Sequence, residues 1–305
     1  MRNSILSLLL LVPISACAST QAQPLSQTEP SECTLVDVTT ETLTGWRENA
    51  FADQQTDKGA RDFASCLGHT SPFLRDQIGY EGLTAALRSG NVSQSTRRDL
   101  LTDLSANLNA KDEAGFLAPF SALGLAELVR TDRIEAFLTP EERSAVVETA
   151  ATYLAGVSDF RAYSDTEGWR HGVAHGADVA MQLALNPNVE AEDLIKLRDA
   201  ITDQITARSG HAFTFGEPER LARPILFMAN RGVISDETWS DWFTALADPA
   251  PLAEWADAFQ SELDLAQLHN LKAFARVLYV NASLSERDAL APITEGALEL
   301  MRALP

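Results

Sequence analysis

The central segment of the chain, residues 159–185, reads DFRAYSDTEGWRHGVAHGADVAMQLAL. We predict that residues 168–185 form one helix. At about 100° per residue, four polar side chains then lie within roughly 60° of one another. We call them the polar seam: His171, His175, Asp178 and Gln182.

The rest of this predicted helix is almost entirely small or apolar, and Arg170 is its only other charged residue. A surface helix normally carries Lys and Glu on its polar face. Gly172 and Gly176 each cost about 1 kcal/mol of helix propensity. We therefore expect a helix that is buried on most sides, with the polar seam facing a cleft or an internal hydrogen-bond network.

Outward from this helix, one pattern recurs every 45 to 51 residues: an aliphatic residue, then a capping or acidic residue that opens an amphipathic helix. The five copies are Val92-Ser93, Leu138-Thr139, Val189-Glu190, Ile234-Ser235 and Leu284-Ser285. Thr139-Pro140-Glu141-Glu142 contains a complete capping box with a first-turn proline.

A further helix is predicted before each copy, over residues 71–89, 113–130, 168–185, 219–231 and 266–281. Strand patterns are nearly absent. The fold class is therefore all-α, a HEAT-like α/α array or irregular α-solenoid of about five helix pairs. In such arrays one helix of each pair lines a concave binding face, so the polar seam lies where a protein or small-molecule ligand would bind.

The N-terminus has the features of a bacterial lipoprotein signal. A basic start leads into an apolar run over residues 5–14, too short to span a bilayer. Ile14-Ser15-Ala16-Cys17 matches a lipobox at all four positions. We expect a signal peptide over residues 1–16, a lipidated Cys17 with a flexible tether to residue 35, and one helical domain over residues 36–305. Ala18 favours the outer membrane, facing the periplasm; an ordinary signal peptide is the alternative.

Charge argues against two classes of partner. Loss of residues 1–16 removes Arg2 and changes the formal charge of −19 by one unit, to −20. Nucleic-acid phosphates would be repelled, and so would a broad anionic lipid surface. We expect membrane contact only through the lipid anchor.

Two cysteines remain beside the lipidated one, Cys33 and Cys66. In an oxidising compartment an even pair is typical of a disulfide. Such a bridge would be worth roughly 3–4 kcal/mol in the chain-entropy model. Two independent buried thiols are the alternative.

His171 and His175 lie one turn apart, the spacing by which a helix presents two metal ligands such as those of zinc. Asp178 would be a third ligand, or the carboxylate that orients an imidazole. No Glu lies between the histidines, so the motif is not that of a zincin. The alternative is a structural network that ties neighbouring helix pairs together.

Three further residues near the seam are candidates for ligand contacts. Trp169 is either a platform for a ligand or part of the core. Arg161 forms either a structural ion pair with Asp159 or an anchor for an anionic group, and Tyr163 follows in the same loop. Glu219 is the best candidate for a distant general base.

These residues resemble a bacterial family known as domain of unknown function 2785. The likeness rests on Asp159-x-Arg161-x-Tyr163 and on Gly168-Trp169-x-His171-x2-Ala174-His175-x-Ala177-Asp178. Leu74-Arg75-Asp76-x3-Tyr80, Glu219-Arg220-Leu221 and Asn270-Leu271-Lys272 extend it over residues 71–279. Arg170 stands where the family has a small residue. The resemblance implies no known reaction.

Two functional hypotheses follow. The first is a lipid-anchored binding or scaffolding protein of the envelope that uses its concave face. The second is a metal-dependent hydrolase with His171, His175 and Asp178 at a divalent metal such as zinc. A hydrolytic zinc site also needs an open position and a base.

Overall fold

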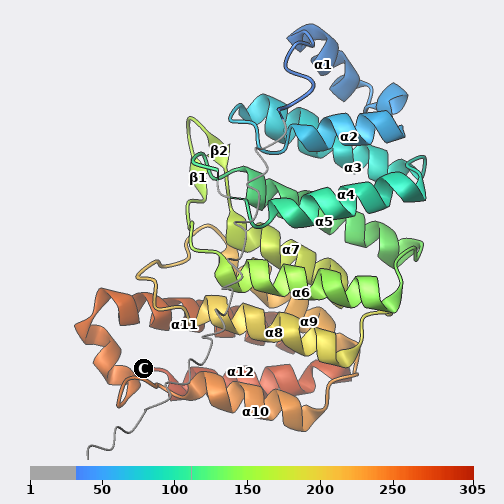
Figure 1. Cartoon of the computed structure of the whole chain (residues 1–305). Coiled ribbons are helices and arrows are strands. Elements are labelled where there is room, and N and C mark those ends of the chain that lie inside the picture. Colours follow the sequence, from blue (N-terminus) through green and yellow to red (C-terminus); the bar gives the residue numbers. More distant parts are fainter. Residues whose placement is uncertain (1–31, 111) are drawn as a thin grey trace, which may run out of the picture.

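The computed structural model describes residues 32–110 and 112–305, and this part of the chain is all-α. Helix α1 (Thr40–Glu48) lies at one end of the molecule, and α10 (Asp236–Ala247) and α12 (Ala291–Ala303) lie at the other (Figure 1). The predicted signal peptide, the lipidation site Cys17 and most of the tether lie outside the described residues.

The folded part begins earlier than predicted. Cys33 and Leu35 are buried, although residues up to 35 were expected to belong to the tether. The structure joins Cys33 to Cys66 by a disulfide. This bond and the burial of Leu35 hold the segment against the first helices, so the boundary of the domain lies before residue 33.

The helices pack in an order that follows the chain. Helix α5 packs against α7, α7 against α9, and α9 against α11, while α6 packs against α8. Their bounds are α2 (Asp57–Ser65), α3 (Glu81–Ser89), α4 (Gln94–Asn107), α5 (Leu117–Ile134), α6 (Pro140–Gly156), α7 (Gly172–Ala184), α8 (Ala191–Ile205), α9 (Glu217–Asn230) and α11 (Glu262–Ser283). This order is the one expected for paired helices, and the HEAT-like assignment stays a prediction.

The repeated capping pattern predicts four helix starts correctly. Ser93, Thr139 and Ser235 accept backbone hydrogen bonds as N-caps of α4, α6 and α10, and Thr139 forms the full capping box. Glu190 is the N-cap of α8 without a side-chain bond. The fifth copy is wrong, because α12 begins only at Ala291, where Pro292 occupies the first turn.

The first helices of the pairs differ from their predicted bounds near the site. Helix α5 begins four residues later than predicted, because the Asp112 carboxylate accepts the N–H groups of Phe116 and Leu117, at 2.8 and 3.3 Å, and so holds the preceding loop. A helix of π type, Phe73–Tyr80, precedes α3 within the predicted 71–89 segment. Helices α9 and α11 contain nearly all of their predicted residues.

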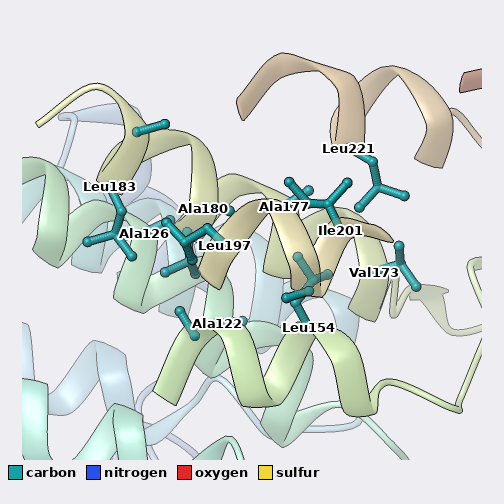
Figure 2. Packing of buried hydrophobic residues seen from close by; sticks show 14 of the residues in the cluster. Ala122, Ala126, Leu154, Val173, Ala177, Ala180, Leu183, Leu197, Ile201 and Leu221 are labelled. Carbon is teal, nitrogen blue, oxygen red and sulfur yellow. The ribbon is translucent and has the colours of Figure 1, made fainter. Parts of the chain in front are cut away.

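Helix α7 is buried on most sides, as its composition predicts. Small side chains face its neighbours: Ala177 and Ala180 lie in the cluster with Ala122 and Ala126 of α5 (Figure 2). A Cβ on Gly176 would lie 3.0 Å from Leu154 of α6. Small residues thus let α7 approach both neighbours closely.

Residues 168–171 are not helical, which corrects the predicted start of this helix. Strand β2 (Gly168–Trp169) pairs antiparallel with β1 (Tyr163–Ser164), and the pairing continues beyond both strands. The N–H of Arg170 donates to Ala162 O at 2.8 Å, and that of His171 to Arg161 O at 3.2 Å. These backbone bonds keep the segment extended, so α7 begins only at Gly172.

Candidate functional site

His171 lies at the junction between the hairpin and α7, in an unusual conformation. It is the N-cap of α7 with φ 56° and ψ 41°, in the left-handed region. Few residues other than glycine adopt this region, and those that do often lie at functional sites. The backbone here is thus held by its surroundings rather than by local preference.

The His171 imidazole is buried beside a carboxylate. Its Nε2 lies 3.7 Å from Glu217 Oε1, beyond hydrogen-bond distance, and has no hydrogen-bond partner among residues 32–110 and 112–305. Burial lowers the pKa of His171, although the Glu217 charge acts in the opposite direction. His171 is therefore a neutral imidazole at pH 7 with an unused polar atom next to an acceptor.

Glu217 was not singled out from the sequence. It is 3% exposed at the side chain and begins α9, and its Oε2 accepts the N–H of Phe215 at 2.8 Å. Glu219, the base predicted from the sequence, is exposed. Gly216, with φ 86°, turns the chain just before α9, so Glu217 rather than Glu219 faces His171.

His175 points into the core. Its Nδ1 lies 3.1 Å from Pro119 O on α5, and its ring meets Phe120 edge-on. Burial lowers the pKa of His175 to about 3. This residue is a neutral core imidazole, 5.9 Å between ring centroids from His171.

Asp178 and Gln182 take part in contacts across helices. Asp178 accepts hydrogen bonds from Arg220 of α9, with Nε at 3.0 Å from Oδ1, and forms an ion pair with it. Burial raises the pKa of Asp178 more than Arg220 and Arg223 lower it. Gln182 Oε1 accepts from Arg133 Nε of α5 at 3.3 Å. The polar seam is therefore not one continuous site: His171 precedes the helix, His175 faces the core, and Asp178 and Gln182 contact arginines of α9 and α5.

No three His, Cys, Asp or Glu side chains in residues 32–110 and 112–305 come together as a metal site. The predicted set fails to converge for a physical reason: His175 bonds to α5, and Asp178 bonds to Arg220. Within the described residues, the structure therefore does not bring Asp178 together with His171 and His175, as the hydrolase hypothesis requires.

Three exposed aromatic side chains adjoin His171, and we call them the aromatic platform: Tyr163, Trp169 and Phe215. Trp169 stacks on the His171 ring with centroids 4.7 Å apart. It also contacts Tyr163, at 5.0 Å between centroids, and Phe215, at 6.1 Å. The three are 48%, 39% and 44% exposed, so an apolar surface lies open to solvent beside the neutral imidazole.

A narrow cleft lies beside His171, between the loop at residues 159–161 and the start of α9. Its lining combines aromatic, charged and backbone groups: Asp159, Phe160, Arg161, His171, Gly172, Val173, Phe213 and Glu217. It is too narrow for a water molecule to enter. Arg161 pairs with Asp159, with Nε 2.8 Å from Oδ1, and both side chains remain about half exposed. That ion pair edges the cleft.

The hairpin is held by two arginines that sandwich one phenyl ring. The guanidinium carbons of Arg75 and Arg170 lie 3.9 and 4.2 Å from the centroid of Phe116. Arg75 also donates to Glu167 O at 2.8 Å, and Arg170 to Ala114 O at 2.7 Å. Arg170 therefore points away from the polar seam and supports the loop.

The family described as "Protein of unknown function (DUF2785)" matches residues 104–280. The chain belongs to this family. Comparison with curated proteins and with solved structures gives no match.

The DUF2785 match covers the hairpin, α7, the aromatic platform and Glu217. It begins after the Leu74-Arg75-Asp76 motif, so it is shorter at its N-terminal side than the resemblance over residues 71–279. Among the described helices of this DUF2785 chain, none has the length and hydropathy required to cross a membrane.

Proposed function

We propose that this DUF2785 protein is a lipid-anchored binding protein of the cell envelope and that the aromatic platform holds a polypeptide partner. The supporting observation is the open surface of Tyr163, Trp169 and Phe215, contributed by two separate loops. Contiguous exposed aromatic residues mark interaction sites, and Trp and Tyr dominate binding energy at interfaces.

The polar groups at the base of the platform are buried and support the aromatic side chains. Nε2 of His171 is buried without a partner, and the Glu217 carboxylate lies 3.7 Å away. An unsatisfied buried polar atom costs about 1–3 kcal/mol. The Nε2 atom is out of reach of a partner, because it is buried and the adjoining cleft does not admit a water molecule. The imidazole therefore contributes to the site as the ring on which Trp169 stacks.

The platform is held ready before a partner arrives. Glu217 fixes the backbone of Phe215 by a hydrogen bond, and the hairpin pairing places Tyr163 opposite Trp169. A surface already ordered in the free protein loses less conformational entropy on binding.

The location rests on the N-terminal sequence, with its complete lipobox at residues 14–17. We expect that Cys17→Ser leaves the protein unprocessed or releases it from membranes. Cell fractionation with an antibody against the protein measures this. A Cys17→Ser protein that fractionates and migrates like the parent would contradict the lipid anchor.

Site-specific photocrosslinking in living cells tests the platform. A photoreactive phenylalanine at Tyr163 should yield an adduct of discrete higher mass that a protease degrades. The same group at Phe259 is the matched control, because Phe259 is 61% exposed and lies in the 3-10 helix Trp255–Gln260, outside the platform. The Tyr163 adduct should disappear when Trp169→Ala is added, because Trp169 is the centre of the platform.

Three results would refute a polypeptide partner: no adduct at Tyr163, an adduct resistant to protease, or an adduct unaffected by Trp169→Ala. His171→Asn separates binding from folding, since Asn tolerates the left-handed region. It should change the melting temperature by no more than about 1–2 °C, in line with about 0.5 kcal/mol, while weakening the Tyr163 adduct.

A further inference from the structure

The face formed by α5, α7 and α9 is locally positive although the chain carries a formal charge of −19. Its arginines come from α3, α5 and α9: Arg88, Arg130, Arg133, Arg220 and Arg223. Three carboxylates lie with them: Glu127, Asp178 and, one turn before Arg223 on α9, the exposed Glu219. Five positive and three negative groups leave a formal surplus of two positive charges.

The two buried carboxylates of this face already form ion pairs. Glu127 forms two hydrogen bonds with Arg88, at 2.6 and 2.8 Å, and Asp178 is paired with Arg220. Both carboxylates are buried.

Three arginines of this face form no ion pair with a carboxylate of the described residues: Arg130, Arg133 and Arg223. Arg133 bonds only to the neutral oxygen of Gln182. Arg130 lies one turn before it on α5, and Arg223 lies one turn after Arg220 on α9, so each pair shares a helix face. Helix α7 lies between α5 and α9 and brings Asp178 and Gln182 between the two pairs.

The charges on this face act on one another. Burial lowers the pKa of Arg133, and the neighbouring Arg130 lowers it further. Arg223 is close enough to Asp178 to lower its pKa against the effect of burial. Glu127 acts on the pKa of Arg133 in the opposite direction, so the positive charges of this face are compensated only in part.

We infer that this arginine strip, Arg130, Arg133, Arg220 and Arg223, binds a compact oxyanion with two or more negative charges, of the polyphosphate class. The planar guanidinium presents paired N–H donors that match phosphate oxygens, and such charge-assisted bonds are about twice as strong as neutral ones. An anion bridging α5 and α9 would neutralise the surplus charge.

The ligand must be compact because of the charge elsewhere on the molecule. The screening length is about 8 Å at physiological ionic strength, so a small anion on the strip is largely screened from distant carboxylates. A long polyanion would extend beyond the strip and meet the rest of a chain with 43 acidic against 24 basic residues.

Titration calorimetry of the full chain with tripolyphosphate tests the inference. We expect one saturable site whose affinity falls by at least about tenfold in Arg130→Gln and in Arg223→Gln, since a hydrogen bond between charged groups is worth about 1.5–3 kcal/mol. Arg302→Gln is the matched control, because Arg302 is exposed in the last turn of α12 and the substitution removes the same charge. Its affinity should stay within about twofold of the parent.

Two further measurements separate a loss of binding from a loss of folding, and a soluble anion from a lipid headgroup. In anion-free buffer, the melting temperature of Arg130→Gln should be no lower than that of the parent, because the substitution relieves the repulsion between Arg130 and Arg133. A lower affinity of this variant is then not caused by loss of folding. Flotation with phosphatidylcholine vesicles, with and without an anionic phospholipid, separates a soluble anion from a lipid headgroup.

Four outcomes would overturn the inference. They are no heat of binding with tripolyphosphate, an equal loss of affinity in Arg302→Gln, unchanged affinity in both strip variants, and binding to anionic vesicles alone. The aromatic platform is not involved in this test, so either proposal can fail without the other.

Discussion

At the scale of single residues, two histidines one turn apart on the sequence have opposite environments. His175 is held by α5 and shielded from solvent, with a pKa of about 3. His171 has an unpaired Nε2 beside Glu217 and the aromatic platform. Burial alone makes both imidazoles neutral, and only His171 borders the cleft. His175 therefore contributes to the stability of the fold, whereas His171 is part of the proposed binding site.

The pKa of His175 predicts a loss of stability in acid. The unfolded chain takes up a proton as pH falls below about 6.5, whereas the folded chain resists protonation until about 3. This contribution to the free energy of unfolding is thus complete above pH about 6.5 and falls by about 1.4 kcal/mol per pH unit between the two values. In urea titrations at pH about 7, 6 and 5, the free energy of unfolding of His175→Gln should therefore fall less steeply with falling pH than that of the parent, by about this amount per pH unit. His269→Gln, at an exposed position, should leave it unchanged; equal slopes in parent and His175→Gln would show that His175 titrates normally.

At the scale of elements, the hairpin before α7 depends on contacts with distant segments. It contains only two residues in each strand, and isolated hairpins are at best marginally stable. Arg75 reaches it from the π-type helix, 92 residues earlier than Glu167, and stacks on Phe116. The platform residues Tyr163 and Trp169 are thus positioned by a residue outside the hairpin.

Arg75→Met should lower the free energy of unfolding by about 3 kcal/mol, because Glu167 O and Asp76 lose a buried cationic partner. It should also expose the 163–169 hairpin to limited proteolysis under native conditions. Arg61→Met removes the exposed ion pair with Asp99 and should change stability by less than about 1 kcal/mol. Equal protease resistance of the hairpin in both variants would contradict the role given to Arg75.

At the scale of the whole molecule, one hydrophobic cluster extends from Cys33 to Leu304. Its first member is linked to α2 through the Cys33–Cys66 disulfide, which closes a loop of 33 residues. A cross-link stabilises mainly by limiting the unfolded chain. The N-terminal end of the core is therefore held by a covalent bond in addition to packing.

Replacing both cysteines, Cys33→Ser with Cys66→Ser, should lower the free energy of unfolding by about 3–4 kcal/mol. A urea titration of the parent with and without a thiol reductant checks the same bond without mutation. The reductant should shift the parent and leave the double variant unchanged. A parent insensitive to reductant, with thiols that react with a maleimide after denaturation, would show that the bond is absent.

Local sequence determined most of the helices, because caps and hydrophobic periodicity act within a few residues. Thr139 caps α6 through Glu142, and Ser93 and Ser235 cap α4 and α10 through residues three positions later. The small residues of α7 likewise predict its burial. The helix start predicted at Ser285 is wrong, because α12 begins only at Ala291, where Pro292 suits the first turn.

The site was decided by tertiary structure. Pairing of the hairpin takes the N–H groups of Arg170 and His171 away from a helix, and this removes His171 from the predicted wheel. Asp178 is committed to Arg220, 42 residues later, and Glu217 rather than Glu219 faces His171. Helical spacing shows which side chains share a face of α7, but their partners come from α5 and α9. Their roles therefore depend on how the chain brings those helices together, which no local pattern in the sequence encodes.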